Sequence, residues 1–163
     1  MRLQLCSLKR YFGDGGKGNY VFLVDEAHNL VDRAREMYSA TLVKEDFLAC
    51  KRVVKDMDKR LASYLEKCNK YLLELKRACD KEYIIIANLQ SCYSYMQKFL
   101  DKNKGKPVCD EIIEFFFKIR HFINMYDCID EKYVIYAEHI DDGDFALHLY
   151  CVDPSGQLSQ RLS

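Results

Sequence analysis

The sequence predicts a mainly α-helical fold, a helical bundle with a small β element, and three observations support this prediction. Residues 45–79 contain neither glycine nor proline, and their apolar residues recur three or four positions apart, as in an amphipathic helix. Residues 108–129 repeat this spacing with mostly large apolar side chains. Strand-like patterns are confined to a short apolar run at 20–25 and to a stretch near the C-terminal end.

The first element is expected to be a strand followed by a helix. The run YVFLV at 20–24 has no polar alternation, which is typical of a strand buried on both faces of a parallel sheet. Residues 28–38 then place apolar residues at helical spacing, and the preceding GDGGKGN is rich in turn-forming residues. We therefore expect loop, strand and helix in this order.

Three helices are expected in the middle of the chain. Residues 45–79 predict one long amphipathic helix, with room for a bend. A second helix is predicted over residues 89–102, before the lysine-rich NKGKP; the β-branched residues 84–86 ahead of it fit a strand, a helix or irregular structure. The third is predicted over residues 108–129 and is apolar enough to lie between neighbours.

A β-hairpin is expected after the helices. The segments KYVIYAEHI and DFALHLYCV flank DDGD, in which Asp142-Gly143 suits a tight turn that needs positive φ. His139 and His148 lie on these strands, where half-buried structural histidines are more common than ligands. The predicted sheet combines the hairpin with the strand at 20–25.

Composition excludes some classes of protein. The 163 residues suit one domain. Lysine plus arginine equals aspartate plus glutamate at 25 each, so any contact with nucleic acid needs a local patch. The apolar runs are shorter than the roughly 20 residues of a membrane span, and the first residues do not resemble a signal peptide. We expect a cytoplasmic protein without membrane contact.

The eight cysteines could form disulfides, bind a metal or pack as thiols. They are scattered without a CxxC pair, and a protein without a secretory signal is expected in a reducing compartment. We therefore expect reduced thiols in the core and no metal bound by this chain.

Asp25 and Glu26 follow directly on the first predicted strand, and His28 comes two residues later. A carboxylate at the carboxyl end of such a strand points into the crevice where α/β sheets bind ligands. In phosphoryl transfer, one carboxylate holds Mg²⁺ and its neighbour can activate the attacking water. The simpler alternative is that the pair complements a helix dipole. The whole string VFLVDEAHNLVDRARE favours the nucleotide site.

FLVDEAHNL and the charged helix after it closely resemble motif II, the Walker B segment, of superfamily 2 helicases of the XPD (xeroderma pigmentosum group D) and DinG type. In that family a helical insertion called the Arch follows motif II, and the chain then returns to the motor domain. The resemblance implies a motif II segment of motor domain 1 at residues 1–40, a helical Arch-like domain at 41–131, and a hairpin with a re-entry segment at 132–163. The residue-level match to motif II covers residues 21–36. The predicted helical region after it matches the Arch only in its position and length.

Other parts of the family's machinery have no counterpart in this sequence. GGKGN at 15–19 contains Lys17 but no following hydroxyl residue, and it leads into a strand, so it does not match a Walker A loop. The family's iron-sulfur cluster uses four cysteines upstream of motif II, where this sequence has only Cys6. The second motor domain is missing too. We interpret the chain as a fragment or degenerate relative, inactive alone, whose parent uses ATP and Mg²⁺ and could carry the cluster.

The resemblance also implies residue roles in the intact parent. Asp25 would position Mg²⁺, Glu26 would activate water, both would contact the nucleotide, and His28 would couple this site to the DNA-binding elements. The parent would hydrolyse ATP, translocate on single-stranded DNA and act in DNA repair, with the remaining motor as this segment's partner. The alternative is a non-enzymatic helical module that binds a protein. Its interface would draw on aromatic residues that equally suit a core: Tyr93, Tyr95, Phe115, Phe116 and Phe117.

One run of lysines is dense enough to contact DNA phosphates. It comprises Lys98, Lys102, Lys104 and Lys106. The alternative is a solvated helix end at which lysines complement the C-terminal dipole.

Overall fold

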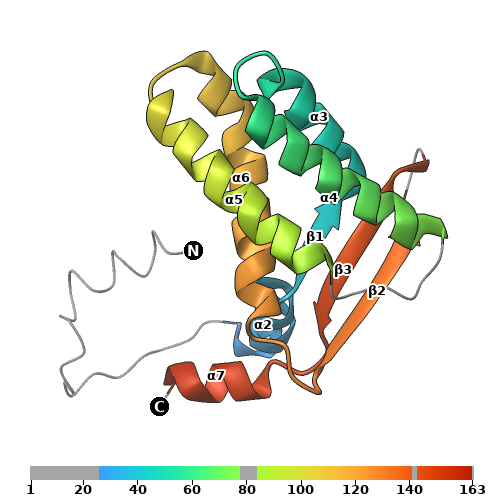
Figure 1. The fold of residues 1–163 in the computed structure, drawn as a ribbon. Coiled ribbons are helices and arrows are strands. Elements are labelled where there is room, and N and C mark those ends of the chain that lie inside the picture. The colour runs from blue at the N-terminus through green and yellow to red at the C-terminus, as the bar shows by residue number, and fades with distance from the viewer. Residues whose placement is uncertain (1–25, 78–83, 141–142, 163) are drawn as a thin grey trace.

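The computed structural model describes residues 26–77, 84–140 and 143–162 (Figure 1). The predicted strand at 20–25 lies outside these residues. A 3-10 helix, Ala27–Asn29, comes first, and the other elements are α2 (Leu30–Tyr38), β1 (Ala40–Val43), α3 (Lys44–Val54), α4 (Lys59–Arg77), α5 (Ile84–Lys102), α6 (Pro107–Tyr126), β2 (Tyr133–His139), β3 (Phe145–Cys151) and α7 (Ser155–Leu162). The prediction of a mainly α fold with a small β element is confirmed.

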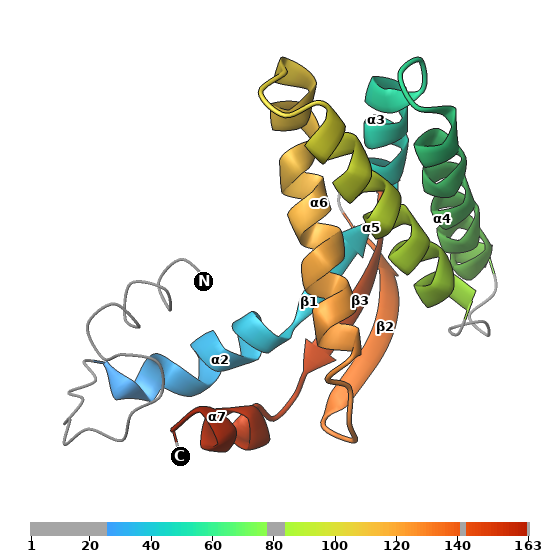
Figure 2. The ribbon, with the colours of Figure 1, turned by 60° about the vertical axis from the view of Figure 1, so that its left-hand side comes forward.

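Four helices, α3 to α6, form a bundle in which each packs against the next along the chain (Figures 1 and 2). The sheet packs against α3, α4 and α6, while α2 and α7 lie together away from the α5–α6 turn. The core fills the space between the bundle and the inner face of the sheet. Its fully buried side chains include Phe47, Leu65, Met96, Ile119 and Leu149.

The prediction of one helix over residues 45–79 is wrong, because the chain reverses between α3 and α4. The break is held locally: Asp58 Oδ1 accepts hydrogen bonds from the backbone N–H groups of Arg60 at 2.9 Å and Leu61 at 3.0 Å. These are N–H groups of the first turn, which have no partner within the helix. Two antiparallel helices bury the apolar stripe against each other, which one straight helix of this length could not do.

The other two predicted helices are confirmed with small changes at their ends. Residues 84–86, which the sequence left open, form the first turn of α5. The turn to α6 contains Gly105 at φ 81°, a left-handed conformation that costs glycine little, and Pro107 opens α6, where a missing N–H does not matter. These two residues explain the sharp connection at the tip of the bundle.

The hairpin is confirmed, with Gly143 at φ 81° in its turn, and β3 is the central strand of the order β1-β3-β2. The strand beside it was not predicted: Ala40–Val43 pairs antiparallel with β3, with Leu42 opposite Leu147. The helix α7 was also missed. Phe145, Leu147, Leu149 and Cys151 are all buried, so alternate residues of β3 face the helices.

Candidate functional site

The motif II segment enters the described structure at Glu26. This residue has φ 51°, in the left-handed region that non-glycine residues seldom occupy and that is often found at functional sites. Asn29 stabilises the turn: its backbone N–H donates to the Glu26 carbonyl at 2.9 Å, and its Nδ2 donates to Glu26 Oε2 at 2.9 Å. Glu26 and His28 are both exposed at the start of α2. Asp25, the predicted Mg²⁺ ligand, lies outside the described residues.

Ser39, at the C-terminal end of α2, connects this helix by hydrogen bonds to both the sheet and the bundle. The Ser39 hydroxyl donates to the carbonyl of Arg35 at 2.7 Å and accepts from the backbone N–H of Cys151 at 3.0 Å. Nε2 of His121, on α6, lies 2.8 Å from the Ser39 carbonyl oxygen and donates to it. Arg35 adds a hydrogen bond to the Val152 carbonyl at 3.2 Å. The helix that carries the motif is therefore joined directly to β3 and α6.

The four predicted DNA-contacting lysines gather at the end of α5 and in the turn to α6. All four are exposed, but they have different surroundings. Lys98 Nζ lies over the ring of Tyr95, 5.3 Å from its centroid, whereas Lys106 Nζ donates to Asn103 Oδ1 at 2.9 Å. α6 extends from this turn toward α2, and its 20 residues span about 30 Å. The lysines and the motif therefore lie at opposite ends of the bundle.

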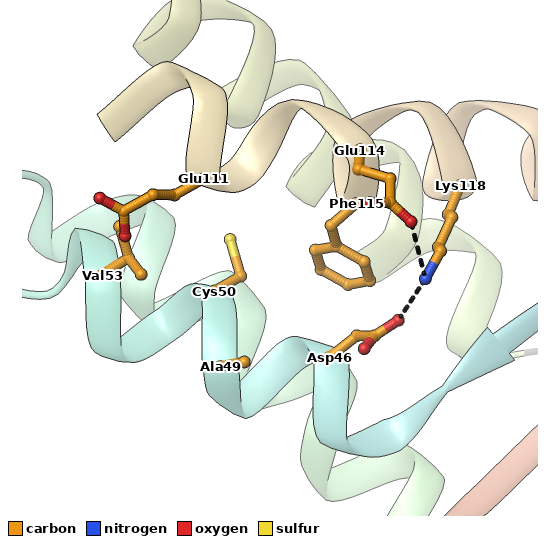
Figure 3. Close-up of a pocket in the computed structure, with 8 residues that line it drawn as sticks. All are labelled: Asp46, Ala49, Cys50, Val53, Glu111, Glu114, Phe115 and Lys118. Carbon is orange, nitrogen blue, oxygen red and sulfur yellow. Dashed lines mark hydrogen bonds and ion pairs between the residues drawn. The ribbon is translucent and has the colours of Figure 1, made fainter. Parts of the chain in front are cut away.

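An acidic pocket of about 210 Å³ lies between α3 and α6 (Figure 3). Asp46, Glu111, Glu114 and Lys118 contribute its charged groups, and Cys50 lies at its base. Lys118 Nζ is 3.2 Å from Asp46 Oδ2 and 3.5 Å from Glu114 Oε1. This pocket could not be predicted from local sequence patterns, because its charged residues come from two helices that are far apart in the chain.

The charged groups of this pocket form a structural contact between α3 and α6. Burial lowers the pKa of Lys118, but the hydrogen bond and charge of Asp46, with Glu114, outweigh this and raise it overall. Burial, aided by the charge of Asp46, raises the pKa of Cys50 to about 12. The thiol therefore stays protonated near neutral pH and is a poor nucleophile.

The cysteines that the structure describes are free thiols, and their burial agrees with the prediction of core thiols. Cys128 is exposed; the buried ones are Cys50, Cys68, Cys92, Cys109 and Cys151. Cys6 and Cys79 lie outside the described residues. Among the described side chains, no three His, Cys, Asp or Glu residues are grouped to hold a metal ion.

A second charge contact, which is partly buried, joins α3 to β3. Lys44 Nζ donates to Glu45 Oε1 at 2.6 Å, and the backbone N–H of Phe145 donates to Glu45 Oε2 at 3.1 Å. Burial raises the pKa of Glu45, but the hydrogen bonds from Lys44 and Phe145, with a hydrogen bond from its own backbone and the charge of Lys44, outweigh burial and lower it overall. The carboxylate therefore holds the start of the bundle against the hairpin.

The chain matches no protein-family model and no curated protein. Within the described ranges, no helix combines the length and apolar character needed to cross a membrane.

Proposed function

We propose that this chain is the motif II and Arch-like segment of an ATP-dependent DNA helicase similar to the XPD and DinG helicases. The observation that carries the proposal is the string FLVDEAHNL, which is followed, after α2 and β1, by a helical bundle. The exposed positions of Glu26 and His28 support it, because a nucleotide held by the remaining motor could reach them. The Ser39 contacts support a role in coupling the nucleotide site to the bundle, since a movement of α2 would displace α6 and β3 through these hydrogen bonds.

In the intact helicase, Asp25 positions Mg²⁺ and Glu26 activates the attacking water, while His28 couples the nucleotide site to the DNA-binding elements. Mg²⁺ keeps several of its waters and binds through one or two carboxylates together with the phosphates. Most of the affinity for a triphosphate comes from a Walker A cradle of backbone amides and its lysine. The 163-residue chain has no such motif, so alone it should neither bind ATP tightly nor hydrolyse it.

Glu26→Gln in the full-length helicase tests the proposal. The substitution removes the base but keeps the side chain's shape, so nucleotide affinity should change little while DNA-stimulated ATP hydrolysis falls by about two to four orders of magnitude. Asp25→Ala should weaken Mg²⁺-dependent nucleotide binding as well. A Glu26→Gln enzyme that hydrolyses ATP at the wild-type rate with DNA present would exclude these roles.

A protein-binding module is the second candidate, and one observation favours it. Phe117 and Ile113, one turn apart on α6, expose 52% and 41% of their surfaces. The other aromatic residues considered for an interface are engaged: Phe115 and Phe116 are buried, and Tyr93 stacks on Phe116 at 5.0 Å between centroids. If Glu26→Gln has no effect on ATP hydrolysis, this apolar pair becomes the first surface to test.

A further inference from the structure

Two tyrosines and two lysines form a stacked group across the contact between α4 and α5. The rings of Tyr64 and Tyr95 stack with centroids 4.8 Å apart and planes at 21°. Lys67 Nζ lies over the Tyr64 ring, 4.8 Å from its centroid, and Lys98 Nζ lies over the Tyr95 ring at 5.3 Å. Each tyrosine thus stacks on the other ring and carries an ammonium group. All four side chains reach the surface.

Two further cations flank this group, and one exposed acid, Asp101, lies between Lys98 and Lys102 along α5. Arg60 lies one turn before Tyr64 on α4, and Lys102 one turn after Lys98 on α5; both are exposed. Because α4 and α5 run antiparallel, both residues lie toward the same end of the bundle (Figures 1 and 2). We call the whole surface the basic-aromatic strip, formed by Arg60, Tyr64, Lys67, Tyr95, Lys98 and Lys102. An acidic residue, Glu74, follows on the exposed side of α4 toward the opposite end.

We infer that the basic-aromatic strip binds single-stranded nucleic acid, with phosphates at the cations and bases on the tyrosine rings. Surfaces that bind single strands without sequence preference combine these two features, because every base has a face that can stack and every nucleotide carries a phosphate. The inference rests on the proposed function only in taking the strand to be DNA. The strip also differs from the predicted lysine run. It shares Lys98 and Lys102 with that run but omits Lys104 and Lys106, and it adds Tyr95 of α5 and three residues of α4.

The energetics allow a base to replace each ammonium group. A cation over an exposed ring contributes about 0.5–1 kcal/mol. A stacked base contributes about 1–3 kcal/mol. A lysine that leaves its ring also gains a phosphate partner, so the exchange favours the bound strand. An acidic peptide would use the cations but would gain nothing from the ring faces.

The test is a fluorescence-anisotropy titration of the 163-residue chain with labelled oligo(dT), without nucleotide, at several NaCl concentrations. Lys67→Gln with Lys98→Gln should reduce the slope of log K against log[NaCl] by about 1.4, because each phosphate contact on a single strand contributes about 0.7. Arg33→Gln with Arg52→Gln removes equal charge from exposed sites outside the strip and should leave the slope nearly unchanged.

The tyrosines distinguish nucleic acid from an acidic protein. Tyr64→Leu or Tyr95→Leu should weaken oligo(dT) binding about five- to 150-fold with the salt slope retained, whereas Tyr→Phe at either site keeps the ring and the affinity. Melting curves verify that each variant is folded. Equal slopes for the strip and control variants would overturn the inference. So would oligo(dT) binding that the Leu variants leave intact, or poly-glutamate binding that is as tight as oligo(dT) binding. Wild-type ATP hydrolysis by the Glu26→Gln parent would refute the proposed function at a separate site and would leave this measurement unaffected.

Discussion

Replacement of Glu45 by Gln tests the contact that joins the bundle to the sheet. In the native state the carboxylate accepts from Lys44 Nζ and from the N–H of Phe145, and the Lys44 side chain is only 11% exposed. A hydrogen bond to a charged group contributes about 1.5–3 kcal/mol, and Gln retains one acceptor oxygen, so we expect a loss of about 1–2 kcal/mol. Glu45→Ala should cost more, because Lys44 then keeps a mostly buried charge without this partner.

The pH dependence follows from the lowered pKa of Glu45. A carboxyl group whose native pKa lies below its unfolded value stabilises the fold when the pH is above the unfolded value, and this stabilisation is lost as the pH falls through the native pKa. The unfolded reference is 4.5. The difference in unfolding free energy between wild type and Glu45→Gln should therefore be full near pH 7 and shrink below pH 4.5.

Urea unfolding followed by circular dichroism, at a series of pH values, measures this difference. The corresponding shift in melting temperature near pH 7 is about 2–8 °C. Glu74→Gln, at an exposed position on α4, is the matched control and should change stability by less than about 0.5 kcal/mol. A double-mutant cycle with Lys44→Gln isolates the ion pair. Equal stability of Glu45→Gln and wild type near pH 7, or a difference independent of pH, would refute the reasoning.

Three further predictions concern the helix cap, the core and the thiols. Asp58→Ala removes the cap of α4 and should cost about 0.5–2 kcal/mol in urea unfolding, with Asp58→Asn recovering most of it; an unchanged midpoint for Asp58→Ala would contradict the capping role. Phe47→Ala should cost about 3–5 kcal/mol, because the ring is fully buried and packs edge-on against Phe115; a cost below about 1 kcal/mol would show that the core is looser than described. In the native protein near pH 8, a thiol reagent should modify exposed Cys128 rapidly and Cys50 only on unfolding, and mass spectrometry showing early modification of Cys50 would contradict its burial and raised pKa.

Local patterns were sufficient to predict several elements. The helical spacing of apolar residues located α5 and α6, and the turn at Gly143 located the hairpin, because these features depend on neighbours within a few positions. The reversal at Asp58 was missed since aspartate within a glycine-free run is compatible with both a helix interior and a cap. The side chain's hydrogen bonds to the next helix decide between them, and these exist only in the folded chain.

The candidate sites also differ in whether local sequence patterns could predict them. The motif around Glu26 is contiguous, so the sequence alone identified it, whereas its Mg²⁺ role stays a prediction. The basic-aromatic strip was invisible because Tyr64 and Tyr95 belong to different helices, and only the packing of α4 on α5 stacks their rings. The same holds for Glu45 and Phe145, which lie 100 positions apart, and for the pairing of residues 40–43 with β3. Sequence periodicity determines which face of an element is apolar, but burial of these faces against one another determines which polar side chains meet.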